Sequence, residues 1–376
     1  MKATFIFLFL VLLFSCQSSE EKQLEKVLTL SGNNRPELEK VLEHYKENEA
    51  DSLKLRAAKF LIMNMPGHQS YIGKDIEEYY VEAEKIIFSD RKIDEQVNEL
   101  NNLLLEFPSD DFEFKEDYSV IKASYLIQSI DAAFDDWQQG RWARGITFDE
   151  FCEYMLPYKC VEFQAFDDWR NVLKPIANDT LCDFSYNDIW NKTPYHAAEA
   201  INIKLRDTVI VDLKKPLKWH ALYKIPFWCN IPSNSCETRT NTALAIMRSK
   251  GFAVSYDFVL QWPTKAHAHS WLSILIDHNR RMVCEGGHEP FLAALRPGEC
   301  KGKVYRRTYS PNSALVRLNK EAGSVPSTLR KTLRMNMQRP LILFFLYFQG
   351  KENAKKDMRI WLYSTMRNGF LFAFRK

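Results

Sequence analysis

The sequence predicts an α+β protein, in which a mainly helical N-terminal region precedes a core with one helix on an antiparallel sheet. Apolar residues recur three and four positions apart through most of residues 31–200, which is the period of an amphipathic helix. Between residues 252 and 285 the pattern changes to strand-like runs separated by turn residues. The 376-residue chain is 46% hydrophobic and 13% aromatic, which is enough to bury cores of this kind.

Residues 1–16 are predicted to be a lipoprotein signal peptide. A basic residue, Lys2, precedes an apolar run at positions 3–14 that is too short to cross a bilayer as a helix. The run ends in Leu13-Phe14-Ser15-Cys16, which resembles a bacterial lipobox. That resemblance implies lipidation of Cys16, for example with palmitate, and an outer-membrane lipoprotein that is surface-exposed or faces the periplasm. An ordinary secretory signal with a chance cysteine is the alternative.

Residues 17–30 are predicted to form a polar tether. They begin Gln17-Ser18-Ser19-Glu20-Glu21-Lys22, which is similar to the acidic export signals of surface lipoproteins of the Bacteroidetes type.

Residues 31–200 are predicted to be a helical region. Pro36 occupies the early position that proline favours in a helix, and Pro66-Gly67 ends a later one. The expected helices cover residues 36–45, 53–63, 75–88, 94–105, 118–138, 148–156 and 162–173. No repeat of fixed period is visible, so a solenoid is not expected.

Residues 201–310 are predicted to form the core. A strand is expected at 207–213, a helix at 237–250, and a further strand at 252–261. Two more strands, 269–276 and 281–285, flank a turn and should pair as an antiparallel hairpin.

Three residues at the edges of these elements point to nucleophilic chemistry. Cys236 precedes the expected helix, where the helix dipole and a nearby imidazole would lower the thiol pKa. His269 opens the hairpin, and the returning strand should bring Glu285 beside it to orient the ring. His267 competes as the base, and Asp277 competes as the acid but lies at the far end of the strand. A buried, unreactive Cys236 is the alternative.

The order Cys236, His269-x-Trp271 and an acid sixteen positions after the histidine resembles the transglutaminase-like superfamily of papain-type cysteine enzymes. The resemblance covers roughly residues 220–310. It implies a papain/transglutaminase-like core in which Cys236 attacks a carbonyl and His269 acts as base and then acid. The family's usual acid is Asp, so Glu285 is a departure.

Trp228 and Asn234 are candidate oxyanion donors because they lie close to Cys236 in the sequence and carry side-chain N–H groups. Packing or turn roles are the alternative for both.

No metal or cofactor is expected. His267, His269, Cys284 and His288 do not have the spacing of a zinc site, and the chain contains no calcium loop.

Residues 311–376 form a basic C-terminal segment with thirteen Lys or Arg and three Asp or Glu, although the whole chain carries a net charge of only +3. A basic segment can indicate nucleic acid or acidic lipid, but no nucleic-acid motif accompanies this one, and no nucleic-acid partner is expected. A truncated or frame-shifted C-terminus is a further hypothesis.

The expected function is therefore that of a transglutaminase-like cysteine hydrolase, of protease or amidase type, with a peptide, protein or peptidoglycan-peptide substrate. The membrane is the second expected partner, through the lipid anchor. The alternative is a catalytically inactive binding or structural lipoprotein that retains the core.

Overall fold

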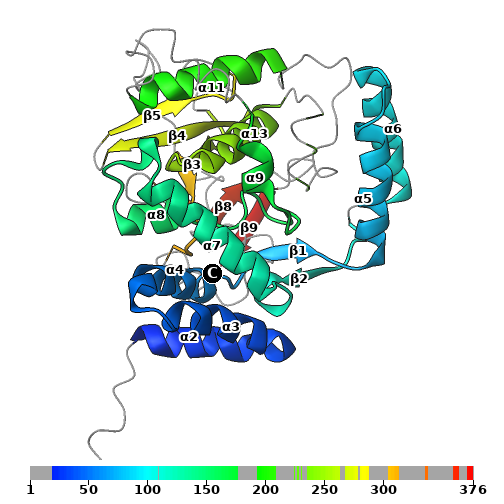
Figure 1. Ribbon diagram of the computed structural model, residues 1–376. Coiled ribbons are helices and arrows are strands. Elements are labelled where there is room, and N and C mark those ends of the chain that lie inside the picture. The colour runs from blue at the N-terminus through cyan, green and yellow to red at the C-terminus, as the bar shows by residue number, and fades with distance from the viewer. Residues whose placement is uncertain are drawn as a thin grey trace, which may run out of the picture.

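The computed structural model describes residues 19–108, 110–176, 193–208, 235–262, 267–277, 280–287 and 304–312, the single residues 224, 227 and 230, and the strands 335–337, 359–363 and 371–375. Helices and antiparallel strands both occur, which confirms the α+β class. The helices α2–α8 come first in the chain, and the main sheet follows (Figure 1). The signal segment 1–16, including Cys16, lies outside the described residues.

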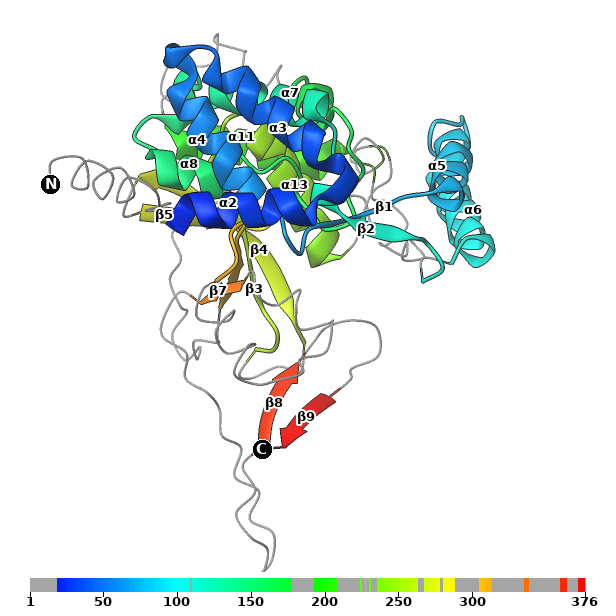
Figure 2. The same ribbon diagram turned by 90° about the horizontal axis from the view of Figure 1, so that it is seen from below.

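Five helices and four short 3₁₀ turns build most of the N-terminal region. The helices are α2 (Ser19–Leu30), α3 (Arg35–Lys46), α4 (Ser52–Met63), α7 (Ala123–Gln138) and α8 (Phe148–Tyr154). The 3₁₀ turns are η1 (Gly32–Asn34), η2 (Glu49–Asp51), η3 (Asp117–Ser119) and η4 (Arg141–Ala143). The helices pack around one apolar cluster, to which α3, α4 and α7 contribute fully buried leucine, valine and alanine side chains. Figure 2 shows α2, α3 and α4 together on one side of the molecule.

The predicted polar tether is wrong for most of its length, because α2 covers residues 19–30. Leu24, Val27 and Leu28 lie three and four positions apart, so they share one helix face. Val27 and Leu28 are buried in the same cluster as α3 and α4, and Leu24 packs against it. Burial of this face explains why the segment is helical despite its polar start.

A helical hairpin interrupts the N-terminal layer. Strand β1 (Gln69–Tyr71) leads into α5 (Lys74–Ile87), α6 (Ile93–Glu106) returns the chain, and β2 (Phe114–Glu116) pairs antiparallel with β1. Both views show α5 and α6 side by side and set apart from the other helices, at the end of the β1–β2 ribbon (Figures 1 and 2). We call residues 74–108 the helical arm.

Three helices lie next to the main sheet: α9 (Trp169–Leu173), α11 (Pro194–Thr208) and α13 (Cys236–Ser249). The predicted helix 162–173 forms only at its C-terminal end. Phe163 has a positive φ of 60°, and the Glu162 carboxylate binds His68 and the backbone N–H of Gln69. The predicted strand at 207–213 is wrong at its start, because α11 continues to Thr208, and residues 209–213 lie outside the described residues.

The main sheet has the order β5-β4-β3-β6-β7. Its strands are β3 (Val254–Val259), β4 (His269–Asp277), β5 (Arg280–Cys284), β6 (Tyr305–Arg307) and β7 (Met335–Met337). All of its neighbouring strands are antiparallel, so the expected hairpin of 269–276 with 281–285 is confirmed. A separate two-stranded sheet pairs β8 (Arg359–Tyr363) with β9 (Leu371–Arg375).

Helix α13 packs against β3 and β4 and supplies the core beneath the sheet. Its positions 238 and 240–249 are all buried, and residues 243–247 form an apolar cluster with Val254, Leu272 and Met282. Two charged residues on neighbouring strands, Asp257 and Arg306, are also buried, and Arg306 donates two hydrogen bonds of 2.8 and 2.7 Å to Asp257, which compensates both charges. Among the described residues, no helix has the length and apolar character needed to cross a membrane.

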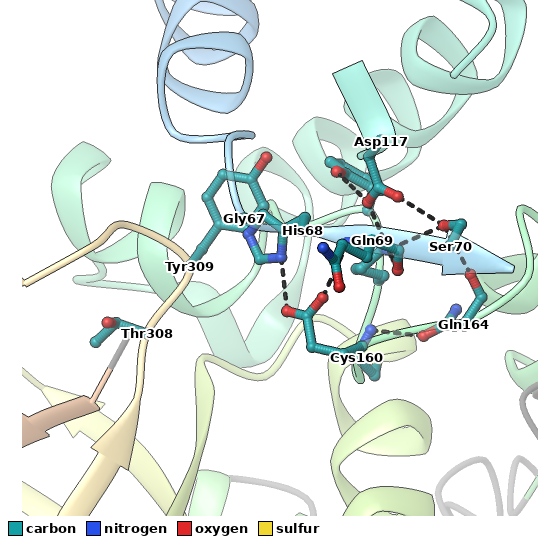
Figure 3. A network of polar contacts seen from close by, with 12 residues as sticks. Gly67, His68, Gln69, Ser70, Asp117, Cys160, Gln164, Thr308 and Tyr309 are labelled. Carbon is teal, nitrogen blue, oxygen red and sulfur yellow. Dashed lines mark hydrogen bonds and ion pairs between the residues drawn. The ribbon is translucent and has the colours of Figure 1, made fainter. Parts of the chain in front are cut away.

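A buried polar network joins the N-terminal layer to the end of the sheet region (Figure 3). Asp117 accepts hydrogen bonds from Ser70 and Tyr158, at 2.6 and 2.8 Å, and pairs with Lys159 at 2.5 Å. Close by, the His68 ring stacks on Tyr309, with ring centroids 4.5 Å apart. Because these residues come from distant parts of the sequence, the network fixes the layers relative to one another.

Candidate active site

Cys236 is the first residue of α13, and the segment that precedes it in the sequence contains two prolines. Ser235 caps the helix, since its Oγ accepts a hydrogen bond from the Thr238 N–H at 3.1 Å. The backbone N–H groups of the first helical turn have no partner within the helix, and they lie at the positive end of the helix dipole. Cys236 is partly exposed, so its thiol sits at a helix start that solvent can reach.

His269 is the first residue of β4 and lies opposite Val259, at the end of β3. Its Nε2 lies 2.7 Å from Oε1 of Glu285. The other ring nitrogen, Nδ1, is therefore available for a hydrogen bond with the Cys236 thiol. The His269 side chain is 23% exposed and that of Glu285 is 40% exposed, so the pair stands at the edge of the core.

The register of the hairpin explains why Glu285 reaches His269. Leu272 lies opposite Cys284, which places the next residue, Glu285, beyond the end of β5 and across from Trp271. His269 and Trp271 are two positions apart and therefore share one face of the strand. Glu285 is thus the diagonal neighbour of His269, a separation that a long side chain can span.

The charges at this site stabilise one another. The pKa of Cys236 is lowered, first by a side-chain hydrogen bond with His269 and then by hydrogen bonds with the side chain and backbone of Ser270, while burial opposes the shift. The pKa of His269 is raised to about 9 by its hydrogen bonds with Cys236 and Glu285, again against burial. Both shifts favour the charged forms of the two groups, a thiolate on Cys236 and an imidazolium on His269.

Ser270 and Tyr256 belong to the site although sequence reasoning did not single them out. Ser270 is buried, and its Oγ lies 3.4 Å from Oγ1 of Thr240, one helical turn after Cys236. Burial raises the pKa of Tyr256, and the nearby charges of Glu237 and Cys236 add to the shift, so its hydroxyl stays protonated. The sequence feature that could have identified Ser270 is its position: it is a small polar residue directly after His269, on the strand face toward α13.

Two tryptophans flank the histidine. Trp262 stacks on Trp271 with ring centroids 6.0 Å apart, and each ring lies about as far from the His269 ring, at 6.1 and 6.0 Å. The backbone N–H of Trp262 also donates a hydrogen bond to the backbone carbonyl of His267 at 3.2 Å, which closes the β3–β4 connection. These rings restrict the positions that the imidazole can adopt.

The structure therefore brings Cys236, His269 and Glu285 together. His267 is exposed, and Asp277 lies opposite Arg280 at the far end of β4. Trp228, Asn234 and His288 lie outside the described residues. Within the described part of the chain, no cluster of three or more His, Cys, Asp or Glu side chains could hold a metal ion.

Comparison of the chain with models of known protein families, with curated proteins and with solved structures gives no match.

Proposed function

We propose that this chain is a transglutaminase-like cysteine hydrolase with a papain-type core. The observation that carries the proposal is the line from the Cys236 thiol through the His269 imidazole to the Glu285 carboxylate. A nucleophile at a helix start, a base at a strand start and an orienting acid on the neighbouring strand form the arrangement that amide-cleaving cysteine enzymes require. The packing of α13 on β3 and β4 supports the papain-type assignment.

In the first half of the reaction, the Cys236 thiolate attacks the carbonyl carbon of a peptide or side-chain amide. The carbonyl electrons move to the oxygen, and backbone N–H groups at the start of α13 would stabilise that charge. Trp228 and Asn234 remain candidates for a further donor. When the tetrahedral intermediate collapses, the C–N bond breaks and His269 gives its proton to the departing amine, leaving a thioester on Cys236.

In the second half, neutral His269 takes a proton from water, and the resulting hydroxide adds to the thioester. The C–S bond then breaks, which releases a carboxylic acid and restores the thiolate–imidazolium pair. Glu285 keeps the imidazole oriented and stabilises its positive charge in both halves. An amine in place of water would give cross-linking, and we favour hydrolysis because water is always present at a cell surface.

The proposed location is the bacterial outer membrane, with Cys16 as the lipidated residue. A lipid anchor there would hold the enzyme at the surface and bring it to polypeptide or peptidoglycan-peptide substrates. Replacing Cys16 with Ser is expected to move the protein from the membrane fraction to the soluble fraction. A variant that still sediments with membranes would remove the anchor from the proposal.

The acyl-enzyme is the direct test of the activity. Incubation with a library of short peptide amides, followed by acid quenching and mass spectrometry, should show an acyl adduct on Cys236. Released amine should accumulate with the unmodified chain and not with Cys236→Ala. Amine release that survives Cys236→Ala would assign the chemistry to another group and end the proposal.

A further inference from the structure

The helical arm projects from the rest of the protein (Figures 1 and 2). Its two helices bury their apolar faces against each other, with Tyr79 and Ala83 of α5 and Val97 and Leu100 of α6 in one cluster. The arm is joined to the helical layer by the β1–β2 ribbon, as both views show (Figures 1 and 2). Its outer surface is therefore not needed to pack the N-terminal layer.

That outer surface is unusually apolar. Eight large apolar side chains are exposed among the described residues, and four of them lie on the arm: Val81, Phe88, Ile93 and Leu105. Val81 on α5 is 53% exposed, and Phe88, directly after the helix, is 55% exposed; the two are seven positions apart, so they form one stripe along the helix. Clustered exposed apolar groups on a folded protein mark an interaction surface more often than isolated ones do.

The same surface is acidic. Residues 74–108 contain ten Asp or Glu and four Lys or Arg, a surplus of six negative charges. On α5, Lys74 pairs with Glu78 and Lys85 pairs with Glu82, so its two lysines are already engaged with neighbouring carboxylates. The net negative charge of the arm would attract a cationic partner and repel an anionic one.

The stripe is continuous with the segment that leads to the nucleophile. The Phe227 ring contacts Tyr80 and Phe88 of α5, with ring centroids 6.2 and 6.4 Å apart. Lys224 reinforces this contact, since its Nζ lies 3.5 Å from Glu84 and 5.4 Å from the centre of the Phe227 ring. Phe227 precedes Cys236 by nine positions. A chain bound along α5 would therefore lie next to Phe227.

We propose that the helical arm is a docking surface for a substrate polypeptide in which lysine or arginine residues alternate with apolar ones. This inference rests on the proposed function, because it takes a polypeptide to be the substrate. Apolar side chains of the substrate pack on the Val81–Phe88 stripe, and its cationic groups face the carboxylates of the arm. Binding there adds contacts to those that the substrate makes at the scissile amide.

Fluorescence anisotropy tests the docking surface separately from catalysis. The probe is a fluorescein-labelled peptide of about fourteen residues made of leucine and lysine, long enough to lie along one helix. The protein is the full chain carrying Cys236→Ala, so that chemistry cannot change the result. Val81→Arg should weaken binding about tenfold, which corresponds to the lost burial of one valine side chain and added charge repulsion. Leu30→Arg on α2, where the leucine is 49% exposed, is the matched control and should leave the Kd unchanged.

A leucine–glutamate peptide of the same length should bind much more weakly, and binding of the lysine peptide should fall with added salt. Equal effects of Val81→Arg and Leu30→Arg, or equal binding of the two peptides, would overturn the docking proposal. Neither result depends on thiol reactivity. Failure of the proposed function would instead appear as a missing acyl adduct on Cys236 in the unmodified chain.

Discussion

The chain contains two histidine–glutamate pairs with nearly equal N···O distances in very different surroundings. His269 Nε2 lies 2.7 Å from Glu285, and His68 Nδ1 lies 2.8 Å from Glu162. The first pair is partly exposed and faces the Cys236 thiol. The second is held in the junction between layers, where His68 is buried and stacks on Tyr309 (Figure 3). An imidazole with an orienting carboxylate is therefore not in itself a catalytic site.

The cysteines show what distinguishes the two regions. Burial raises the pKa of Cys160, which lies near the His68 network, and the nearby Arg248 and Arg170 only partly offset that shift. Burial also raises the pKa of Cys152 and Cys284. Among the described cysteines only Cys236 has a lowered pKa, because His269 and Ser270 hydrogen-bond to it directly. What distinguishes the candidate active site from the His68 network is therefore the thiol at a half-exposed helix start, since both regions contain a His–Glu pair.

The largest expected effect comes from the two thiols. Cys236→Ala should lower amide turnover by at least about 10⁴-fold, since the remaining site can only bind and polarise the substrate. Cys160→Ala should leave turnover unchanged and cost about 1 kcal/mol in the free energy of unfolding, because it removes a small buried side chain. Steady-state kinetics and urea unfolding measure both. Comparable losses of turnover in Cys236→Ala and Cys160→Ala would contradict the assignment of the chemistry to Cys236 alone.

The two histidines should separate in the same way. His269→Ala is expected to lower turnover about as strongly as loss of the thiol, because members of a catalytic unit are not additive. His68→Ala should instead lower the free energy of unfolding by about 2–3 kcal/mol, since it leaves Glu162 without its buried partner. Thermal unfolding and kinetics on the same samples separate the outcomes. A turnover defect in His68→Ala at temperatures where it is fully folded would contradict the account.

Exchange of each carboxylate for an amide sharpens the comparison further. Glu285→Gln should reduce turnover by about 10²- to 10⁴-fold, because an amide N–H can favour the wrong imidazole tautomer. Glu285→Asp should be milder. Glu162→Gln is the matched control, and it should affect stability alone. An unimpaired Glu285→Gln enzyme would leave a Cys236–His269 dyad without a third member.

The smallest expected effect belongs to Ser270. Ser270→Ala removes one of the hydrogen bonds that lower the pKa of Cys236 and retains the backbone N–H and His269. The loss of one such bond should raise the thiol pKa modestly and reduce turnover at neutral pH by about three- to tenfold. Thiolate absorbance at 240 nm, read against pH, measures the shift. If the titration were unchanged, the Ser270 side chain would have no part in holding the thiolate.

The sequence predicted those parts of the site that depend on local pattern. A helix beginning next to Cys236 and a hairpin from His269 to Glu285 follow from apolar period and turn residues, and the structure contains both. Pairing within a hairpin fixes the register from local sequence alone, so the closeness of His269 and Glu285 was foreseeable.

The missed parts depend on contacts between distant segments. Ser270 becomes important only because α13 packs against β4 and brings Thr240 to it. Glu162 and Gln164 read as part of a helix, but they bind His68 and the Cys160 N–H instead, which no local pattern indicates. The N-terminal residues read as a tether because they are polar, whereas two apolar side chains on one face fold them into α2.

The pH dependence of Cys236 alkylation tests the central claim most directly. The lowered pKa of Cys236 favours the thiolate, which is the form that the proposed function requires, and the pKa of about 9 keeps His269 protonated through neutral pH. Iodoacetamide should therefore alkylate Cys236 at pH 6 at a rate within about threefold of the rate at pH 8, and His269→Ala should abolish that plateau. A rate that rises about tenfold per pH unit toward an ordinary thiol pKa near about 8.5, in both proteins alike, would contradict the thiolate–imidazolium pair and the proposed function with it.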